Sequence, residues 1–551
     1  MKKKNIVFAV VTCFSLCLAS DWPTFRGDMQ RTGCSPQKTG LPSARPLWQY
    51  RAKGAFVSSP SIVKDALYIG CRDSTLCAIG ATTGSRLWSR KMKGWFDSSP
   101  VLYGDSLVVG CLDQHIYVLN RNTGVSLGEF PAGFQLSSPA VLADGTILTL
   151  IGHPYNALAK YQRDGPKNPW PLLFKQPMYS SVAVAGNMAV FGGNDGFLYG
   201  VNLSSNRIQW SVRTAGTTYL STPAISDSLV FFAPGDFDRN IYAVWLSDGA
   251  IYWKGEGNGN RAKTGPAAVA RVPSSLIGRM QHMTPLQRTR WLEYYQKQGA
   301  PFAKRSLLEK SSAGSAAGWV SADDRVRTSS VTVDANNVYL VQRELGYTNI
   351  IDMVPQSRYT LLAIDKATGN QVWSFTDYCT GAIAGYNASP VATVSHLFFG
   401  WGEGMVYACD KKSGQVVWRD TLNGDILSSP AVANGKLYVA TMAGNLYCFD
   451  LKNTPTGLDF QQSTFCYPNP ARGRASTIQV YVERAGKLSM TLFNIAERPV
   501  FHVDENLQAG QKYVKEWDLS GVANGVYFAQ IKVIYTQGGV DKKTLKIAVL
   551  H

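Results

Sequence analysis

The sequence predicts an all-β chain, in which an eight-bladed β-propeller with four-stranded blades, closed into a ring by an N-terminal strand, precedes an immunoglobulin-like β-sandwich. Three observations carry this prediction. The phrase IDKATGNQVW (364–373) recurs in close variants, a Ser-Ser-Pro-like triplet recurs at steps near forty residues, and the end of the chain lacks both but alternates apolar and polar residues. A repeat of about forty residues made of short strands is typical of propeller blades.

We expect three parts along the chain. They are a signal peptide at 1–20, the propeller at 21–455 with a basic, partly helical insertion at 257–328, and the C-terminal sandwich at 456–551.

Residues 1–20 have the layout of a secretory signal peptide. Three lysines precede an apolar run from Ile6 to Leu18, and the small residues Ala19 and Ser20 follow it. The run is too short to span a bilayer comfortably, and no later segment is long and uncharged enough to do so. We therefore expect cleavage near Ser20 and an exported chain with no transmembrane segment. Processing as a lipoprotein at Cys13 or Cys17 is the alternative.

The triplets mark the units of the propeller. Their third positions are separated by 40, 39, 43, 41, 108, 59 and 40 residues, so five intervals match one blade and two contain insertions. The triplets are Ser58-Ser59-Pro60, Ser98-Ser99-Pro100, Ser137-Ser138-Pro139, Ser180-Ser181-Val182, Ser221-Thr222-Pro223, Ser329-Ser330-Val331, Ala388-Ser389-Pro390 and Ser428-Ser429-Pro430.

Each unit divides into four strands, which in the first unit are SSPSIV, ALYIGC, TLCAI and SRLW. A glycine before the fourth strand supplies the positive φ that a tight hairpin needs. These glycines are Gly84, Gly124, Gly165, Gly249, Gly369 and Gly414. A tryptophan at the end of that strand can bury a large flat surface against the neighbouring blade. We expect a structural docking role for Trp48, Trp88, Trp170, Trp210, Trp253, Trp373 and Trp418, whereas the unit near Leu127 lacks such a residue.

The two ends of the repeat region predict how the ring closes. Trp48 belongs to a fourth strand that has no preceding three, and the last unit, 428–450, has three strands and no fourth. We therefore expect the two ends to share one blade, which removes the exposed edges of an open sheet.

The additional sequence of the propeller is expected on one face. In a four-stranded blade, the connection between the second and third strands and the connection to the next blade emerge on the same face. The insertion at 257–328, with twelve Lys/Arg and four Asp/Glu and a helix expected at 285–298, lies there together with expanded loops at 234–240, 343–358 and 374–387. Long loops on a rigid scaffold commonly carry function, so we predict a partner or ligand face. Its candidate contact residues are Tyr347, Arg358, Tyr378 and Tyr386.

The loop GDFDRN is a candidate calcium site. Asp236, Asp238 and Asn240 alternate along it, a spacing that can place three oxygens around the ion, although the loop lacks the later glycine and distal glutamate of an EF-hand. A plain polar turn is the alternative. The sequence shows no identifiable pair of catalytic carboxylates, no phosphate-binding glycine loop and no Gly-x-Ser-x-Gly elbow, so we predict no catalytic residue.

Composition narrows the classes of partner. The chain has 551 residues, 45% of them hydrophobic, and a formal charge of +17 that is concentrated locally. No nucleic-acid motif accompanies the basic residues, so we expect a solvated surface and no nucleic-acid partner. Eight cysteines follow the signal peptide without a CxxC spacing, which excludes standard c-type haem attachment and favours buried small side chains over a zinc site.

The recurring phrase and the triplet together resemble the pyrroloquinoline-quinone-like (PQQ-like) repeats of quinoprotein alcohol dehydrogenases and of the propeller lipoprotein in the outer-membrane β-barrel assembly machine. DWPTFRG (21–27) looks like an opening signature of the exported relatives. The resemblance implies the fold but leaves enzyme and scaffold open. Quinoproteins of this type hold the quinone under a vicinal disulfide, beside calcium and a catalytic aspartate. Because this chain has no Cys-Cys pair, we predict no cofactor, with PQQ and calcium as the alternative.

The C-terminal strands are similar to the sorting domain of the type IX secretion pathway. The resemblance rests on Tyr467-Pro468-Asn469-Pro470 at their start and on Gly525-Val526-Tyr527-Phe528 near their end, and Glu497 departs from it where the family usually has glycine. It implies the secretion machinery as a partner and delivery to the cell surface or medium. A plain immunoglobulin-like adhesion module is the alternative.

These observations predict an exported, non-enzymatic binding or scaffolding propeller at the cell surface or in the medium, with an unknown protein or glycan as its ligand. The alternatives are a PQQ-dependent quinoprotein dehydrogenase and a periplasmic scaffold for outer-membrane protein assembly.

Overall fold

The fold is seen in a computed structural model of the chain. It describes residues 21–162, 170–217, 221–235, 238–256, 326–348, 355–380, 388–451, 460, 464–467, 469, 471–472, 475–482, 484–509 and 511–550. These residues are almost entirely β-strands and turns, with a short 3₁₀ helix, η2 (Gly402–Gly404), so the all-β prediction is confirmed. The predicted signal peptide and the helix predicted at 285–298 lie outside the described residues.

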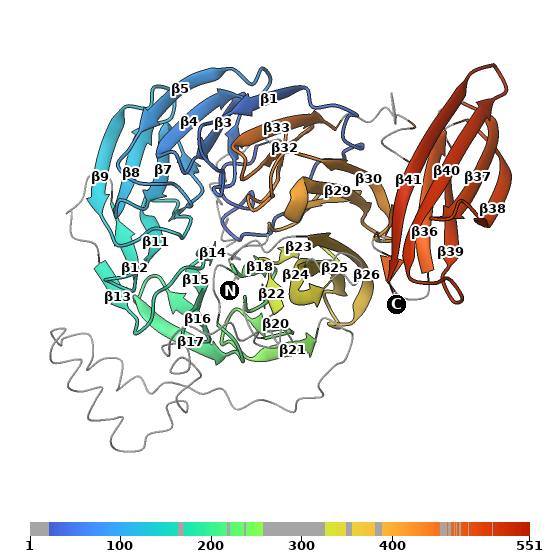
Figure 1. The fold of residues 1–551 in the computed structure, drawn as a ribbon. Coiled ribbons are helices and arrows are strands. Elements are labelled where there is room, and N and C mark those ends of the chain that lie inside the picture. Colours follow the sequence, from blue (N-terminus) through green and yellow to red (C-terminus); the bar gives the residue numbers. More distant parts are fainter. Residues whose placement is uncertain are drawn as a thin grey trace, which may run out of the picture.

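The repeats form sheets that follow one another around a ring (Figure 1). Between Trp48 and Asp450 the described residues make eight antiparallel sheets, numbered 1 to 8 here in chain order. In sheets 1 to 5 and 7, four strands consecutive in the chain are also neighbours in the sheet. This is the arrangement of a β-propeller, and the four strands predicted for the first unit correspond to β2 to β5.

Each sheet takes its strands from one repeat, except for sheet 8. Sheets 1 to 4 contain β2 (Ser61–Val63), β3 (Ala66–Gly70), β4 (Thr75–Gly80) and β5 (Arg86–Lys91); β6 (Val101–Tyr103), β7 (Ser106–Cys111), β8 (His115–Asn120) and β9 (Ser126–Pro131); β10 (Ala140–Val141), β11 (Ile147–Ile151), β12 (Ala157–Tyr161) and β13 (Trp170–Leu173); and β14 (Ala183–Ala185), β15 (Met188–Gly193), β16 (Phe197–Asn202) and β17 (Arg207–Arg213). Sheets 5 to 7 contain β18 (Ala224–Ser226), β19 (Leu229–Phe232), β20 (Asn240–Trp245) and β21 (Ile251–Glu256); β22 (Val326–Thr328), β23 (Thr332–Val333), β24 (Asn337–Thr348), β25 (Pro355–Asp365) and β26 (Gln371–Thr380); and β27 (Val391–Ala392), β28 (His396–Gly400), β29 (Met405–Asp410) and β30 (Val416–Thr421).

Sheet 8 combines the two ends of the repeat region. Its strands β31 (Ala431–Ala433), β32 (Lys436–Ala440) and β33 (Asn445–Asp450) come from the last repeat, and β1 (Trp48–Arg51) pairs antiparallel with β33. The register runs from Trp48 opposite Cys448 to Arg51 opposite Asn445. The first and last strands of the repeat region therefore share one sheet.

The tryptophan and the glycine of the recurring phrase meet at the interfaces between sheets. The indole of Trp253 lies against Gly369 of the next sheet, where an added Cβ would be 2.7 Å from the ring, and its N–H donates to the Lys366 carbonyl at 2.9 Å. The same contacts join Trp48 to Gly84 and Ala81, Trp88 to Gly124 and Arg121, Trp210 to Gly249 and Leu246, and Trp373 to Gly414 and Lys411. These five glycines have φ between 70° and 73°, as predicted. The tryptophan and the glycine of the recurring phrase thus form one interlock between neighbouring sheets. The glycine that makes the turn in one sheet also leaves room for the indole of the preceding sheet.

Two interfaces depart from this pattern. Gly128 takes the tryptophan's place in sheet 2, since it pairs with Val118 as Trp88 pairs with Ala78, and there Phe130 packs on Tyr161 of sheet 3 with ring centres 5.2 Å apart. Trp418 is buried and packs edge-on against Phe449 at 5.4 Å. The side chain of Trp170 lies outside the described residues.

Replacing Gly369 by alanine is expected to destabilise the propeller by about 2–4 kcal/mol. The methyl group would collide with the Trp253 ring, and overpacking a tight core typically costs about 1–3 kcal/mol, to which the positive φ adds about 1 kcal/mol. The measurement is the denaturant midpoint of the folded chain. Gly186→Ala is the matched control, because Gly186 has φ 53° but no atom within 4 Å of an added Cβ, so only the backbone cost remains. Equal losses for the two variants would contradict the interlock.

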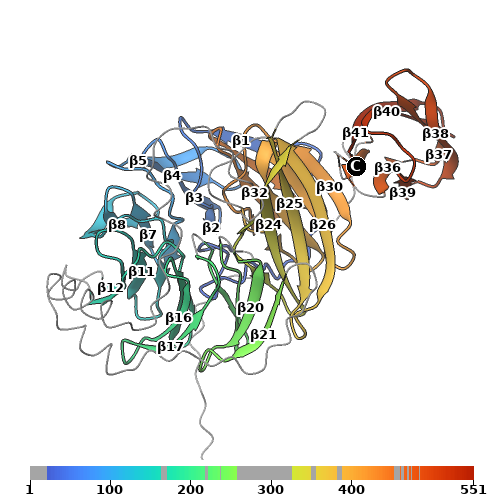
Figure 2. The ribbon, with the colours of Figure 1, turned by 60° about the horizontal axis from the view of Figure 1, so that its bottom comes forward.

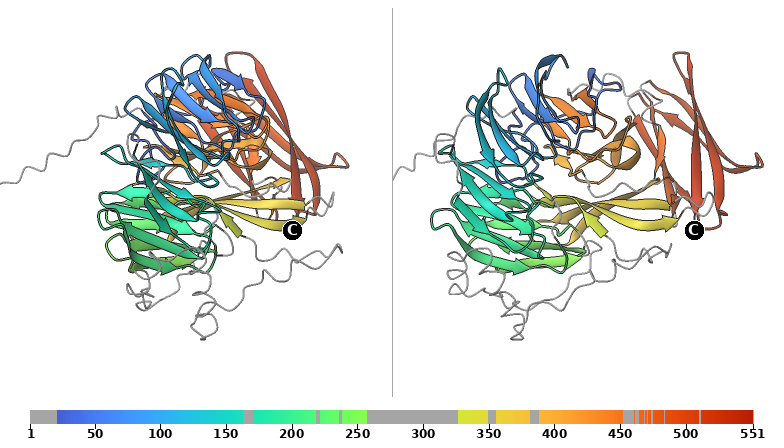
Figure 3. Two further views of the ribbon diagram at one scale, coloured as in Figure 1. Left: turned by 90° about the vertical axis from the view of Figure 1, so that its left-hand side faces the viewer. Right: turned by 60° about the vertical axis from the view of Figure 1, so that its left-hand side comes forward.

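Sheet 6 differs from the others in the length of its strands. β24, β25 and β26 have 12, 11 and 10 residues and reach beyond the neighbouring sheets (Figures 2 and 3). The prediction of expanded loops at 343–358 and 374–387 was therefore wrong for most of these residues, which continue the strands to Thr348, from Pro355 and to Thr380. The additional sequence in this unit suggested loops, but much of it lengthens the paired strands, as where Glu344 lies opposite Arg358.

The C-terminal residues form two further sheets. One contains β34 (Phe465–Tyr467), β36 (Ala475–Val482) and β39 (Gln511–Asp518), and the other contains β35 (Ala471–Arg472), β41 (Val540–Leu550), β40 (Gly525–Tyr535), β37 (Gly486–Asn494) and β38 (Pro499–Leu507). Their shared core includes Met490, Trp517 and Ile547. Glu497 sits in the β37–β38 turn with φ 56°, a conformation that favours glycine, which explains why glycine suits this position.

The C-terminal unit contacts the outer strands of sheets 6 and 7 (Figure 1). Phe465 is buried in their aromatic cluster, and the Arg419 guanidinium lies 4.6 Å from its ring centre and donates to the Cys466 carbonyl at 3.4 Å. Beside them the buried carboxylate of Asp377 accepts the Tyr407 hydroxyl at 2.6 Å. These packing, cation–π and hydrogen-bond contacts therefore join the C-terminal unit to sheets 6 and 7.

The cysteines behave as buried side chains. The eight that follow residue 20 are thiols, and all but Cys34 are buried. Burial raises the pKa of the Cys71 and Cys111 thiols to about 12, so neither is a reactive thiolate at neutral pH. This confirms their interpretation as small core residues.

Candidate functional site

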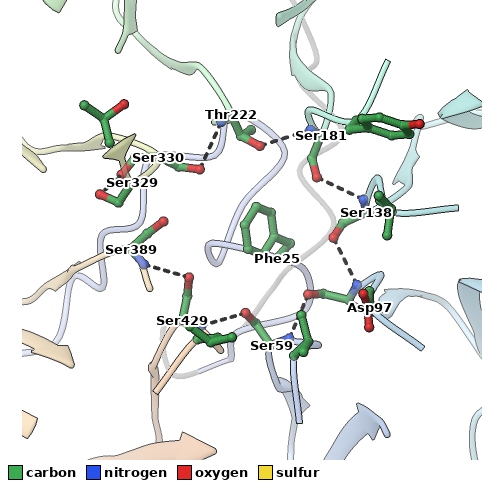
Figure 4. A pocket seen from close by; sticks show the side chains of 16 residues that line it. Phe25, Ser59, Asp97, Ser138, Ser181, Thr222, Ser329, Ser330, Ser389 and Ser429 are labelled. Carbon is green, nitrogen blue, oxygen red and sulfur yellow. Dashed lines mark hydrogen bonds between the residues drawn. The ribbon is translucent and has the colours of Figure 1, made fainter. Parts of the chain in front are cut away.

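The triplets surround a central channel (Figure 4). In seven of the eight described triplets, the backbone N–H of the second residue donates to the side-chain oxygen of its counterpart in the next sheet at 2.9–3.0 Å. The described bonds run from Ser59 through Ser99, Ser138, Ser181 and Thr222 to Ser330, and from Ser389 through Ser429 back to Ser59. The second position of the triplet thus lines the channel and links the sheets.

In four repeats the first serine of the triplet binds its own sheet. The hydroxyls of Ser58, Ser98, Ser180 and Ser329 accept the backbone N–H of Gly70, Gly110, Gly192 and Val341 at 2.9–3.3 Å. Buried hydroxyls need such partners, which explains why two adjacent serines recur. The pattern is structural, but it surrounds the channel with hydroxyl groups.

Residues 21–35, here called the plug, close one end of the channel. Their backbone bonds the first strands of successive sheets, with Pro23 accepting from Leu102 at 2.9 Å, Met29 from Val184 at 2.7 Å and Gly33 from Ala392 at 2.9 Å. The ring of Phe25 lies within the circle of hydroxyls in Figure 4. The opening signature of the sequence therefore forms the floor of the channel.

The plug contains two buried arginines, Arg26 and Arg31, and the partly buried Asp28. Arg31 donates to the carbonyls of Val182 and Pro139 at 2.9 and 2.8 Å, and thereby joins sheets 4 and 3. Arg26 donates to the hydroxyl of Thr332 in sheet 6 at 2.7 Å. Burial lowers the pKa of both guanidinium groups to about 10, so they stay charged at neutral pH, and it raises the pKa of Asp28.

Sequence reasoning missed these three residues. Their roles depend on partners such as Pro139, which is 108 positions from Arg31. The available signal was the presence of two arginines and an aspartate in a segment otherwise rich in turns and aromatic residues, directly before the first repeat.

Beside the hydroxyl ring, the channel lining is mostly apolar. Among the described residues, those that precede a triplet and line the channel are Val57, Asp97, Leu136, Tyr179, Thr328 and Leu427, of which Asp97 alone is charged. Arg72 donates to both oxygens of Asp97, at 2.8 and 2.6 Å. The lining is therefore close to neutral.

This lining does not fit PQQ with calcium. The quinone carries three carboxylates, which require basic partners, and calcium requires several oxygen ligands. The described lining contains no basic side chain, and its acid, Asp97, is already held by Arg72. Nor do the described residues include a group of three or more His, Cys, Asp or Glu side chains placed to hold a metal ion.

The candidate calcium loop is only partly described. Asp236 lies outside the described residues. Asp238 is buried, and its oxygens accept the N–H of Asn240 at 2.9 Å and the hydroxyl of Tyr242 at 2.7 Å. The same Asp-to-Tyr bond recurs at Asp113–Tyr117 and Asp195–Tyr199, at 2.8 and 2.6 Å. The carboxylate thus serves a recurring turn, and calcium binding stays a prediction.

The candidate partner residues converge on sheet 6. Arg358 on β25 lies opposite Tyr378 on β26 and forms an ion pair with Glu344 on β24. Arg239 approaches the other oxygen of Glu344 at 3.4 Å. Tyr347 belongs to β24, although its side chain is not described, and Tyr386 lies outside the described residues. Arg358 and Tyr378 are therefore strand residues, not loop residues as predicted.

Models of two known protein families match the propeller and the C-terminal unit of the chain. A model described as outer membrane protein assembly factor BamB matches residues 39–135, 112–344 and 357–456. A model described as the secretion system C-terminal sorting domain matches residues 466–545. In the described part of the chain, no helix has the length and hydropathy needed to cross a membrane.

Similar curated proteins share only part of their length with this chain. The outer membrane protein assembly factor BamB of Shewanella oneidensis is 32% identical over 97 residues, which cover 16% of this chain and 25% of that protein. The protein of the same name from Vibrio cholerae is 31% identical over 116 residues, covering 19% and 30%. The chain thus spans less than a third of the length of these relatives.

Solved structures show the shared fold. The quinohemoprotein alcohol dehydrogenase from Comamonas testosteroni superposes with a TM-score of 0.55 at 13% identity, covering 80% of this chain and 82% of that one. A europium-containing methanol dehydrogenase gives 0.52 at 13% identity, covering 79% and 98%. At these identities the likeness concerns architecture and not activity.

Proposed function

The chain belongs to the family described as outer membrane protein assembly factor BamB, and on that premise we propose that it is an exported, non-enzymatic binding or scaffolding propeller, delivered to the cell surface or medium by its C-terminal unit. The observation that carries the proposal is the match of residues 466–545 to a sorting domain. In the propeller, polar groups of the channel bond to one another, as where Ser59 links two sheets and Arg72 binds Asp97. A scaffold needs a rigid body and an accessible face for its partner. The ring of sheets supplies the first, and the long strands of sheet 6 can supply the second.

The proposal includes finer points of architecture. The ring has eight blades closed by the shared sheet 8, and the β1–β33 pairing and the bond from Ser429 to Ser59 support this. Residues 1–20 act as the signal peptide. The two C-terminal sheets form an immunoglobulin-like sandwich, in support of which they enclose one core.

The long strands of sheet 6 form the proposed protein-partner face. Arg358 and Tyr378 lie side by side on them, and the insertion at 257–328 ends at Thr328, which lines the channel. Glu344 holds two arginines in place there, which limits the side-chain entropy lost when a partner binds.

Removing residues 456–551 is expected to abolish delivery to the surface. In a bacterium with a type IX pathway, we expect the full chain in the surface or medium fraction and at least a tenfold drop there for the truncated chain, which should remain in the envelope. Quantitative immunoblots of separated fractions and protease treatment of intact cells measure this. Glu497→Gly is the control, since glycine suits φ 56° and should preserve export.

Three outcomes would contradict the proposal. Equal surface delivery without the C-terminal unit would exclude its sorting role. Saturable heat on titrating the full chain with PQQ and calcium, together with dye-linked alcohol oxidation, would favour the dehydrogenase alternative. Retention in the envelope with outer-membrane assembly components would favour the periplasmic scaffold.

A further inference from the structure

Exposed aromatic side chains gather beside the channel on sheets 2 and 3. Trp95, Phe134 and Tyr155 are 52%, 41% and 56% exposed, which is high for large rings. Trp95 and Phe134 occupy equivalent positions, three residues before the first serine of successive triplets. Other described repeats have Ala55, Pro177 and Asp425 at this position, so fold requirements do not demand an aromatic residue there.

Contacts connect these rings to the channel lining by two routes. Phe134 exchanges backbone bonds with the β11–β12 connection, donating to His153 and accepting from Gly152 at 3.1 Å each, and Tyr155 belongs to that connection. Tyr179, which lines the channel, packs on Gly152, where an added Cβ would be 2.8 Å from its ring.

The second route runs through the ion pair of the lining. The Arg72 guanidinium lies 5.8 Å from the ring centre of Trp95 and also binds Asp97, which lines the channel. Both groups of aromatic rings therefore connect to residues that line the channel. We call this surface, made of Trp95, Phe134, Tyr155, Arg72 and Asp97, the aromatic rim.

The hydroxyl ring below the rim has donors to offer. The side-chain oxygens of Ser59, Ser99 and Ser138 accept backbone N–H groups, and no bond among the described residues uses their O–H protons. The same holds for Ser181, Thr222, Ser330 and Ser429. These protons are left to water or to a ligand that enters the channel.

We propose that the aromatic rim and the channel mouth bind a neutral oligosaccharide. A sugar ring presents a C–H face to an aromatic face and hydroxyls at its edge, and this surface supplies three rings, hydroxyl donors and one donor–acceptor pair. The charges of Arg72 and Asp97 compensate each other, so the surface offers no net charge to an ionic ligand. This inference deepens the proposed binding role and rests on it, but it concerns a different sector from sheet 6.

The test is binding of the purified full-length chain to an array of neutral oligosaccharides that includes cellohexaose, maltohexaose and xylohexaose, followed by titration calorimetry with the best binder. We expect saturable binding by the natural chain and at least tenfold weaker binding by both Trp95→Ala and Phe134→Ala. Trp245→Ala is the matched control, because Trp245 is 40% exposed but lies at the end of β20 in sheet 5, and it should bind as the natural chain does.

Other outcomes would overturn the inference. These are no binding to any neutral oligosaccharide, preferential binding of peptides or charged glycans that survives Trp95→Ala, or equal loss with Trp245→Ala. Circular dichroism of each variant separates misfolding from loss of contact, and Phe134→Tyr, which keeps a ring, should restore binding. Because export is measured separately, a delivered chain that ignores glycans would contradict only this inference, whereas a glycan-binding chain that is not delivered would contradict only the proposed export.

Discussion

Replacing Trp253 by alanine is expected to lower the stability of the propeller by about 3–5 kcal/mol, the range for truncating a buried core aromatic side chain. Trp253 is 4% exposed, its N–H donates to the Lys366 carbonyl at 2.9 Å, and its ring covers Gly369 and lies 6.0 Å from Phe231. Its loss leaves a cavity and an unsatisfied carbonyl at the interface between sheets 5 and 6. Denaturant unfolding followed by tryptophan fluorescence and circular dichroism measures the change.

Trp245 provides the control within the same sheet. It is 40% exposed, so Trp245→Ala should change stability by no more than about 0.5 kcal/mol. Similar small effects for both variants would show that the indoles do not lock the sheets together. Trp373 is only half-buried, so its truncation should fall between the two.

Replacing Arg31 by alanine is expected to cost about 3–5 kcal/mol, the range for removing one member of a buried charged network. The guanidinium is fully buried and donates to Val182, Pro139, the Thr24 hydroxyl at 2.6 Å and the Phe25 carbonyl at 2.8 Å. Without it these acceptors stay buried without their donor, which is costly. Hydrogen exchange of residues 22–33 should rise along with the loss of stability.

Two further variants make the result specific. Arg31→Lys keeps the charge but has one nitrogen in place of a planar fork, so it should recover only part of the loss. Arg86→Ala removes an exposed arginine on β5 and should change stability by no more than about 0.5 kcal/mol. If Arg31→Ala unfolded like the natural chain, with exchange of the plug unchanged, residues 21–35 would not be an integral part of the ring.

Local signals account for the parts of the structure that were predicted correctly. The triplet, the Thr-Gly turn and the terminal tryptophan each act within a few residues, so their spacing predicted the strands β2 to β5 and the positive φ of Gly369. The candidate site was harder. The positions of the insertion and the expanded loops suggested a partner or ligand face. The side chains that connect the aromatic rim to the channel, such as Arg72 and Asp97, are 25 positions apart and belong to different repeats, so their proximity could not be predicted.

By itself, the sequence determined the class of the fold, the repeating unit and the pairing of the two ends of the repeat region, because these depend on periodic local patterns and on an incomplete unit at each end of that region. Only the tertiary structure decided that the opening segment is a plug, that polar residues after Arg343 continue the strands of sheet 6, and that Phe465 anchors the C-terminal unit. These features depend on contacts between residues far apart in the chain, such as Arg31 with Pro139 at 108 positions and Trp253 with Lys366 at 113. No local pattern encodes such partners, since these contacts arise only when sheets from different repeats pack against one another.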